Sequence, residues 1–284
     1  MVVMSDQPTP PARSFGDVAA AYDRARPPYP HEAAVWLTGE QPVSVLELGA
    51  GTGKLTESLA AIGHDVHATD PDAKMLAVLA ERLPEVRTAV ASAEEIPAPD
   101  SSFDVVVVAQ AFHWFDLDLA LPEIARVLKP RGTLSLVWNR ADQRIPWVRR
   151  LGAIIGTQDQ RPDPAAGLAH SPLFGAVEEA TYRFWQVVDR ESIQDLALSR
   201  SNISTLDDEA RAAKLAEVLA FYDDFGRGMD GMQLPYVAAC FRAVTLPQAA
   251  NQHDDSVGGE PGESDDPGSV SDGTDADVLL IDFR

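Results

Sequence analysis

The stretch VSVLELGAGTGKLT, residues 43–56, decides the fold of this 284-residue chain. It begins with an apolar run and holds Gly49, Gly51 and Gly53, after which residues 54–61 have helical spacing. An apolar run that leads into glycines predicts a strand, a tight turn and a helix. Glycine lets the backbone approach a ligand closely, and the first turn of the helix offers it free N–H groups. We therefore predict a ligand-binding strand–loop–helix unit.

Two other nucleotide-binding loops fail on spacing. The dinucleotide fingerprint G-x-G-x-x-G, counted from Gly49, requires a third glycine where Lys54 stands. A phosphate-binding P-loop requires four residues between its first glycine and its Gly-Lys pair, but only three separate Gly49 from Gly53. Leu55 also occupies the position where that loop needs Ser or Thr to hold magnesium. A glycine-rich turn that binds no ligand remains the alternative.

Strand and helix patterns alternate along the first half of the chain. Apolar runs predict strands at 43–48, 65–69, 87–90, 103–109 and 133–138. Helical spacing predicts helices at 54–61, 72–82 and 119–128, with Asp72 as the N-cap of the second. Residues 103–109 are apolar on both faces, which is typical of a central parallel strand. The alternation predicts an α/β fold, a parallel sheet with helices on both faces.

The pattern changes beyond Asn139. Helices are predicted at 147–156 and 207–223, and two longer strands at 180–188 and 232–244. We interpret them as the edge of the same sheet, with helical insertions over residues 140–230 that cover a substrate pocket. At the other end, a helix is predicted at 15–24 and is ended by prolines, which cannot continue it: Pro27, Pro28 and Pro30.

Composition separates the two ends of the chain from a globular middle. Residues 1–13 are rich in proline and are predicted to be a disordered leader, whereas residues 14–246 form the folded domain with a core at 43–139. Residues 247–284 are rich in Gly, Ser, Asp and Pro and are predicted to be a disordered acidic tail. The tail ends in an apolar cluster at 278–283. This cluster is either a frayed end or a docking peptide for the same chain or for an unknown partner.

The charge of the chain disfavours a nucleic-acid partner. The formal net charge is −21, and residues 254–284, with ten acidic residues and one Arg, contribute −9 of it. A protein that grips a phosphate backbone needs a basic face. The sequence shows no secretory signal pattern and no apolar stretch long enough for a membrane span. We expect a cytoplasmic protein with neither a nucleic-acid nor a membrane partner.

Cysteine and histidine usage argues against a metal site. Cys240 is the only cysteine, which excludes an intrachain disulfide and a cysteine-based zinc cluster. Most histidines are scattered along the chain, and we expect them at the surface: His31, His64, His67, His170 and His253.

The glycine loop resembles motif I of the class I S-adenosylmethionine-dependent methyltransferases. Its pattern is E-x-G-x-G-x-G, from Glu47 to Gly53. Asp70 closes the second strand, where that family keeps an acidic residue for the ribose hydroxyls. Segments 93–104 and 128–133 are similar to the family's adenine-side segment and to the turn before its fifth strand. The resemblance implies a Rossmann-like fold with a seven-stranded, mostly parallel sheet.

The resemblance extends to a subgroup that includes trans-aconitate methyltransferase-like proteins. Residues 22–30, YDRARPPYP, are similar to the start of that subgroup, and residues 109–115, AQAFHWF, to its segment after the fourth strand. Ser199-Arg-Ser201 and Leu234-Pro-Tyr236 resemble its later landmarks. Ala91-Ser92 departs from the pattern, because many relatives have Gly-Asp there.

The resemblance implies a site for S-adenosylmethionine along one edge of the sheet. Glu94 or the main chain at Ala93 would replace the carboxylate that the departure removes near adenine. Tyr22 and Arg26 are expected either to fold over the cofactor as a lid or to pack as an ordinary helix end. The implied cofactor-binding residues are Tyr22, Arg26, Glu47, Gly49, Ala50, Gly51, Gly53, Asp70, Pro71, Ser92, Ala93, Glu94, Gln110 and Ala111.

The acceptor side is predicted from position. Methyl transfer from a sulfonium depends mainly on positioning, and a general base is needed only for an acceptor that is protonated at the working pH. His113 follows the fourth strand, so it is a catalytic base, an orienting residue or an aromatic-packed pocket wall. Trp114 and Arg200 are assigned with His113 to the acceptor pocket.

The sequence therefore predicts a methyltransferase that acts on a carboxylate or hydroxyl oxygen of a small molecule. Arg26 and Arg200, together with the resemblance, favour an acidic acceptor. Two alternatives stay open: a methyltransferase for tRNA or protein, and a protein that binds S-adenosylmethionine without transferring its methyl group.

Overall fold

A computed structural model describes residues 25–156, 165–225 and 231–247. The chain divides into two units, Met1–Gln248 and Ala249–Arg284, and all of the described residues belong to the first. The predicted leader, the helix at 15–24 with Tyr22, and the acidic tail beyond Pro247 with its apolar tip lie outside the described residues.

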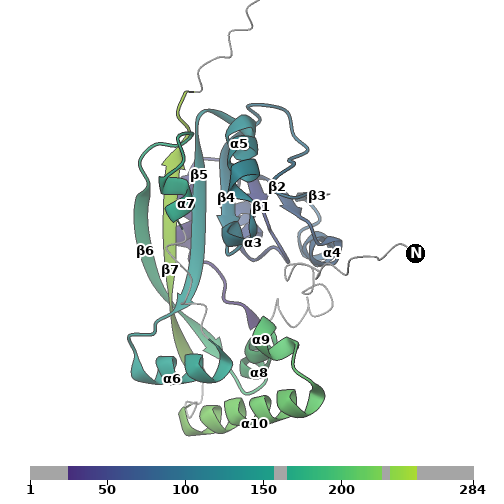
Figure 1. The fold of residues 1–284 in the computed structure, drawn as a ribbon, viewed down its shortest axis with the longest axis vertical. Helices are drawn as coiled ribbons and strands as arrows, with labels where there is room; N and C mark the ends of the chain where they lie inside the picture. Colours follow the sequence, from purple (N-terminus) through teal and green to yellow (C-terminus); the bar gives the residue numbers. More distant parts are fainter. Residues whose placement is uncertain (1–24, 157–164, 226–230, 248–284) are drawn as a thin grey trace, which may run out of the picture. The chain divides into compact units, whose positions relative to one another are not determined.

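One sheet of seven strands organises the described chain (Figure 1). The strands are β1 (Ser44–Leu48), β2 (Asp65–Asp70), β3 (Arg87–Val90), β4 (Phe103–Ala109), β5 (Leu128–Ala141), β6 (Glu178–Val188) and β7 (Met232–Val244). Their order is β3-β2-β1-β4-β5-β7-β6. Strands β1 to β5 run parallel, and β7 is antiparallel to both β5 and β6. The predicted seven-stranded, mostly parallel sheet is confirmed.

The described helices form two groups, which pack against different parts of the sheet. The first group is α2 (His31–Thr38), α3 (Lys54–Ile62), α4 (Ala73–Arg82), the 3₁₀ turn η2 (Phe112–Trp114), α5 (Leu117–Val127) and α7 (Ala166–Ala169). The second is α6 (Pro146–Ile155), α8 (Ser192–Leu198), α9 (Ser201–Ser204) and α10 (Asp208–Phe225). None of the helices in the described ranges is long and apolar enough to cross a membrane.

Alternation along the central strand β4 decides which helices cover which face. Val105 and Val107 pack in one cluster with α2 and α3. Val106 and Val108 point the other way and pack in a second cluster with α5 and α7. Successive side chains of a strand point to opposite faces, so a strand apolar at every position needs cover on both. The prediction of helices on both faces is confirmed.

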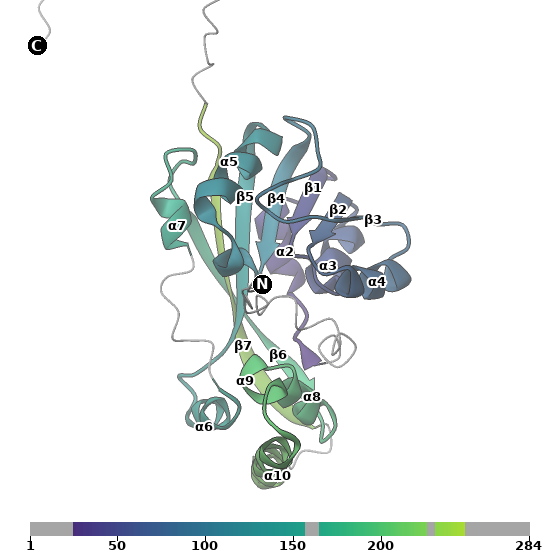
Figure 2. The ribbon, with the colours of Figure 1, turned by 45° about the vertical axis from the view of Figure 1, so that its right-hand side comes forward.

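The second helix group packs around one end of β6 and β7 (Figure 2). Its buried side chains form a separate cluster with Val188 at the end of β6, Met232 at the start of β7, and Leu234. Leu151 of α6 and Leu196 of α8 are almost fully buried there. The expected helical insertions are therefore present, and they enclose the space beyond the end of β5.

The proline-rich segment before the glycine loop leads into a helix that was not predicted. Pro30 directly precedes α2, an eight-residue helix for which the sequence patterns predict nothing. A proline is tolerated at a helix start because the first N–H groups have no intrahelical partner. Ala33, Ala34 and Leu37 of α2 are buried against the sheet. The short helix thus depends on tertiary packing more than on a local pattern.

His64 is buried, so its expected position at the surface is wrong. It is 7% exposed, and its Nε2 lies 2.8 Å from the hydroxyl of Thr38 while its Nδ1 accepts a hydrogen bond from the main chain of Val43. Burial lowers the pKa of the His64 imidazole. The ring therefore ties α2 to the start of β1 as a neutral group. No cluster of metal-ligating side chains occurs among the described residues.

The N-cap of α4 gives a direct test of local stability. Asp72 accepts a 2.8 Å hydrogen bond from the main-chain N–H of Lys74, as predicted. We expect Asp72→Ala to lower the free energy of unfolding by about 1 kcal/mol in a urea titration. Asp72→Asn keeps a capping oxygen and should lose much less. Equal losses in both variants would show that the negative charge, and not the cap, stabilises this helix.

Candidate active site

The glycine loop after β1 packs too closely against its surroundings for larger residues. Gly49 has φ of +69°, and a Cβ added there would lie 2.6 Å from the Cβ of Ala111, in the segment after β4. Gly53 has φ of +86°, and its Cβ would lie 2.7 Å from the side chain of Leu79. Both positions need glycine for the left-handed backbone and for space. The loop is therefore held against two neighbouring elements.

Glu47 lies beneath this loop, near the end of β1. It is 1% exposed, and its Oε2 accepts a 2.6 Å hydrogen bond from the hydroxyl of Thr56 in α3. Burial raises the pKa of the Glu47 carboxyl to about 8, against the effect of the Thr56 hydrogen bond and with a further contribution from the charge of Asp70. Near neutral pH this carboxyl holds a proton, which a cation bound beside it would displace.

Asp70 closes β2 beside the same loop. Its Oδ2 accepts from the main-chain N–H of Gly51 at 2.9 Å, and its Oδ1 accepts from that of Asp72 at 2.8 Å. Burial raises the pKa of Asp70, and the two main-chain hydrogen bonds oppose that effect. Each oxygen keeps a lone pair beyond these bonds, so the carboxylate can still accept from a ligand's hydroxyl groups.

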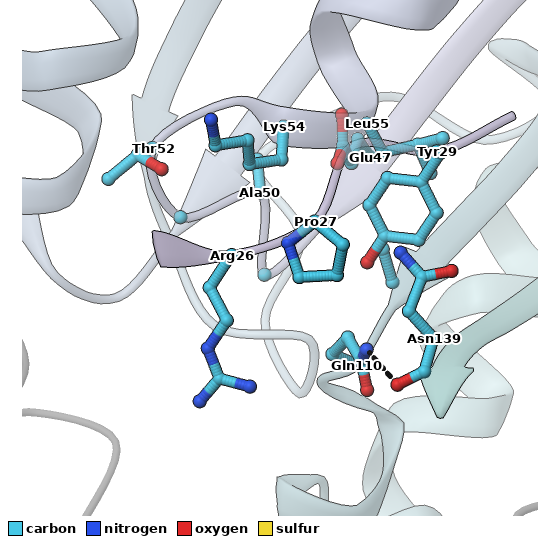
Figure 3. Close-up of a pocket in the computed structure, with 13 residues that line it drawn as sticks. Arg26, Pro27, Tyr29, Glu47, Ala50, Thr52, Lys54, Leu55, Gln110 and Asn139 are labelled. Carbon is cyan, nitrogen blue, oxygen red and sulfur yellow. Dashed lines mark hydrogen bonds between the residues drawn. The ribbon is translucent and has the colours of Figure 1, made fainter. Parts of the chain in front are cut away.

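A cavity, the loop cavity, opens between the glycine loop and the chain segment before α2 (Figure 3). In Figure 3, Arg26 and Pro27 lie between the loop above and Gln110 below. Gln110 has a left-handed φ of +60°, and its amide donates to the main-chain oxygen of Asn139 at 3.1 Å. The lining residues are Arg26, Pro27, Tyr29, Glu47, Gly49, Ala50, Gly51, Thr52, Lys54, Leu55, Ala109, Gln110 and Asn139.

Six of the residues predicted for cofactor binding line the loop cavity: Arg26, Glu47, Gly49, Ala50, Gly51 and Gln110. Other predicted residues lie outside its wall: Gly53, Asp70, Pro71, Ser92, Ala93, Glu94 and Ala111. They still follow the carboxyl ends of β1, β2, β3 and β4, which are neighbours in the sheet. Ser92 forms an isolated bridge with Glu95, and Glu94 accepts from the main chain of Asp116.

His113 and Trp114 lie on the short turn η2 after β4. Both are exposed, Trp114 to 43%, and their ring centroids are 4.8 Å apart. Neither lines the loop cavity or the second cavity described next. Their predicted roles in the acceptor pocket stay predictions.

A second cavity lies beyond the carboxyl end of β5 and shares Asn139 with the loop cavity. Arg200, which was predicted for the acceptor pocket, lines it. Arg26 approaches the same region, because its guanidinium donates to the main-chain oxygen of Ser199 at 3.3 Å. The lining residues are Asn139, Arg140, Ala141, Gln143, Val148, Leu151, Gly152, Ile155, Gly156, Leu196, Arg200, Leu234 and Tyr236.

Asn139 and Tyr236 are site residues that the sequence patterns did not assign. Asn139 lies near the end of β5 and directly follows the predicted strand at 133–138, as Gln110 follows β4, so its place at the end of a parallel strand was the available signal. Tyr236 does not follow a parallel strand, because it lies on the antiparallel strand β7. It reaches the cavity because it pairs with Ala141 of β5.

Comparison with known proteins identifies relatives along most of the chain. Residues 46–136 match a family model described as a methyltransferase domain. An uncharacterized methyltransferase of Mycobacterium bovis is 44% identical over 235 residues, which cover 81% of this chain and 95% of that protein. An uncharacterized methyltransferase-like protein of Schizosaccharomyces pombe is 35% identical over 216 residues, 72% of this chain and 84% of that protein.

Solved structures share the fold. One, described as a type II methyltransferase from Anaeromyxobacter dehalogenans, has 26% identity and a TM-score of 0.54, covering 78% of this chain and 99% of its own. Phosphoethanolamine N-methyltransferase 2 of Haemonchus contortus, solved with S-adenosyl-L-methionine, has 20% identity and a TM-score of 0.50, covering 83% of this chain and 60% of its own. At that identity the second likeness concerns the fold alone.

The clash at Gly49 can be separated from backbone strain. Gly49 and Gly51 both have positive φ, but a Cβ at Gly51 would meet nothing within 4 Å. We expect Gly49→Ala to be less stable than Gly51→Ala by about 1–3 kcal/mol in denaturant unfolding, because only the first overpacks against Ala111. Equal losses would mean that the left-handed backbone alone accounts for the cost.

The buried Glu47 predicts a pH-dependent stability. Its pKa is about 8 in the folded chain, against an ordinary value of 4.5 for a solvent-exposed carboxyl. Between these values the folded state binds more protons than the unfolded state, so this group makes stability fall as pH rises. We expect the free energy of unfolding of Glu47→Gln, compared with that of wild type, to increase from pH 5 to pH 8 in parallel urea titrations.

The exposed Glu81→Gln, on α4, is the matched control and should follow wild type across the same pH range. If wild type and Glu47→Gln differ in free energy of unfolding by the same amount at every pH, the raised pKa is contradicted.

Proposed function

This chain belongs to the methyltransferases, and on that premise we propose that it methylates an oxygen of a small anionic acceptor held in the second cavity. The enzyme is S-adenosylmethionine-dependent, and S-adenosylmethionine is its cofactor. When bound, this cofactor supplies a methyl group already activated on a sulfonium, and it leaves as neutral S-adenosylhomocysteine.

The residues at the carboxyl edge of the sheet fit this cofactor. Gly51 lines the loop cavity, and a Cβ added there would meet nothing within 4 Å, so its bare backbone faces open space that a ligand can approach. We assign the ribose hydroxyls to Asp70 and the adenine side to the segment from Ser92 to Glu94. Glu47, a carboxyl whose proton a cation displaces, suits the positive charge of the cofactor.

One observation carries the choice of acceptor. The second cavity shares Asn139 with the loop cavity, and the described residues that line it include Arg140, Arg200 and Tyr236 but no carboxylate. Arg200 lines the cavity and the charges of Arg200 and Arg26 both act on Tyr236, an environment that favours an anion. A carboxylate acceptor needs no general base, and its oxygen would form the new bond to carbon as the sulfonium bond breaks.

A hydroxyl acceptor must lose its proton, and His113 is the proposed base for such an acceptor. Its position after β4 on the same edge of the sheet supports that assignment, with Trp114 beside it. Arg26 holds the segment before α2 against Ser199, which supports its proposed role as part of a lid.

The trans-aconitate methyltransferase-like subgroup remains part of the proposal. Its support is that two of the subgroup's landmarks, represented by Arg200 and Tyr236, line the same cavity. The cytoplasm is the proposed compartment, and the single buried thiol of Cys240 fits a reducing environment.

The test follows a labelled methyl group from S-adenosylmethionine. Purified full-length protein is incubated with labelled cofactor and a panel of small carboxylic and hydroxy acids, or with bulk tRNA and protein. We expect label in extractable small products and none in acid-precipitable material. Asp70→Ala should bind S-adenosylhomocysteine at least tenfold more weakly in calorimetry and transfer less label.

Asp65→Ala is the matched control, because Asp65 begins the same strand at its opposite end and is exposed. It should bind S-adenosylhomocysteine as wild type does. Label in tRNA or protein would replace the small-molecule proposal with a macromolecular one. Tight cofactor binding with no transfer to any acceptor would indicate a binding protein.

A further inference from the structure

Buried polar atoms without partners gather around the second cavity. Within the described chain, Tyr236 Oη and Asn139 Oδ1 have no hydrogen-bond partner, although the side chains are 3% and 5% exposed. Both residues line the cavity. Proteins rarely leave buried polar groups unpaired, because each loses its hydrogen bonds to water on burial. A ligand in the cavity would supply the missing hydrogen bonds to both atoms.

Tyr236 is held rigidly as a donor. Its ring stacks on Phe184, with centroids 5.5 Å apart and planes at 21°. Its backbone lies in β7, opposite Ala141 in β5. Burial raises the pKa of the Tyr236 phenol, and the charges of Arg200 and Arg26 oppose that effect without reversing it. The phenol therefore keeps its proton and has an O–H to donate to an acceptor oxygen.

The lining of the cavity combines polar and aliphatic residues. Its polar residues include Asn139, Arg200 and Tyr236. Its aliphatic residues come from α6, α8 and β7, namely Val148, Leu151, Ile155, Leu196 and Leu234. A polyanion would place additional charge against these aliphatic side chains, and that burial is unfavourable.

On the basis of the proposed function, we propose that the acceptor is a monocarboxylic acid with an apolar body, and that the Tyr236 phenol selects its carboxylate by donating a hydrogen bond. The guanidinium of Arg200 supplies the counter-charge. The apolar body lies against α6 and α8. Tyr236 is thus a specificity-determining residue for the acceptor, separate from the cofactor site at the glycine loop.

The test measures acceptor binding, without turnover. Full-length protein saturated with S-adenosylhomocysteine is titrated calorimetrically with hexanoate, 1-hexanol and citrate. We expect hexanoate to bind more tightly than the other two. Tyr236→Phe should weaken hexanoate binding by about tenfold or more, since a hydrogen bond to a charged group is lost. It should leave hexanol binding unchanged.

Tyr182→Phe is the matched control, because it makes the same change on the neighbouring strand β6 away from both cavities. It should bind hexanoate as wild type does. Both variants should bind S-adenosylhomocysteine normally and unfold at the wild-type midpoint, which shows that the cofactor site and the fold are intact.

Three results would overturn the inference: hexanoate does not bind to wild type, citrate binds more tightly than hexanoate, or Tyr236→Phe binds hexanoate as wild type does. If labelled methyl still appears in another small molecule, the proposed function survives and only this inference fails. Label in macromolecules alone would remove the proposed function as well.

Discussion

The approach of Gly49 to Ala111 is the contact on which the site depends. Strands β1 and β4 pair in parallel, with Leu48 opposite Val108, so the segments that follow them emerge side by side. There is no room for a side chain at Gly49 between them. That closeness brings the loop to Gln110, which in turn donates a hydrogen bond to the main chain of Asn139 near the end of β5. Three successive strand ends therefore form one continuous surface, as expected at the carboxyl edge of a parallel sheet.

Acidic and basic residues are separated along that edge. Glu47 is buried beneath the glycine loop, with Asp70 beside it, and both carboxyl groups have raised pKa values because of burial. At the other end, the described residues that line the second cavity include Arg140 and Arg200 and no acid. A cationic ligand favours the first region and an anionic ligand the second. Methyl transfer from a sulfonium to an oxygen anion neutralises both charges. A site with an acidic region and a basic region therefore suits the cationic cofactor and the anionic acceptor before they react.

Local patterns predicted the central sheet well and its margins less well. The strands Arg87–Val90, Phe103–Ala109 and Met232–Val244 have the predicted bounds, because each is a distinct apolar or alternating run. β5 extends from Leu128 to Ala141, beyond the predicted 133–138, since its last residues pair with β7 and Leu128 pairs with Phe103 of β4. α2 and the burial of His64 were missed for a related reason. Both depend on packing between α2 and the start of β1, which no short window of sequence contains.

The sequence by itself determined the glycine loop, the acidic residue that closes β2 and the α/β alternation. These features are local: a left-handed turn needs glycine, and a strand buried on both faces needs a continuous apolar run. Only the tertiary structure decided that Asn139, Arg200 and Tyr236 share one cavity. They lie on three elements far apart in the chain, and β7 reaches the cavity by inserting antiparallel between β5 and β6. Side-chain chemistry can be read from residue order, whereas the meeting of distant side chains depends on how the packed elements approach one another.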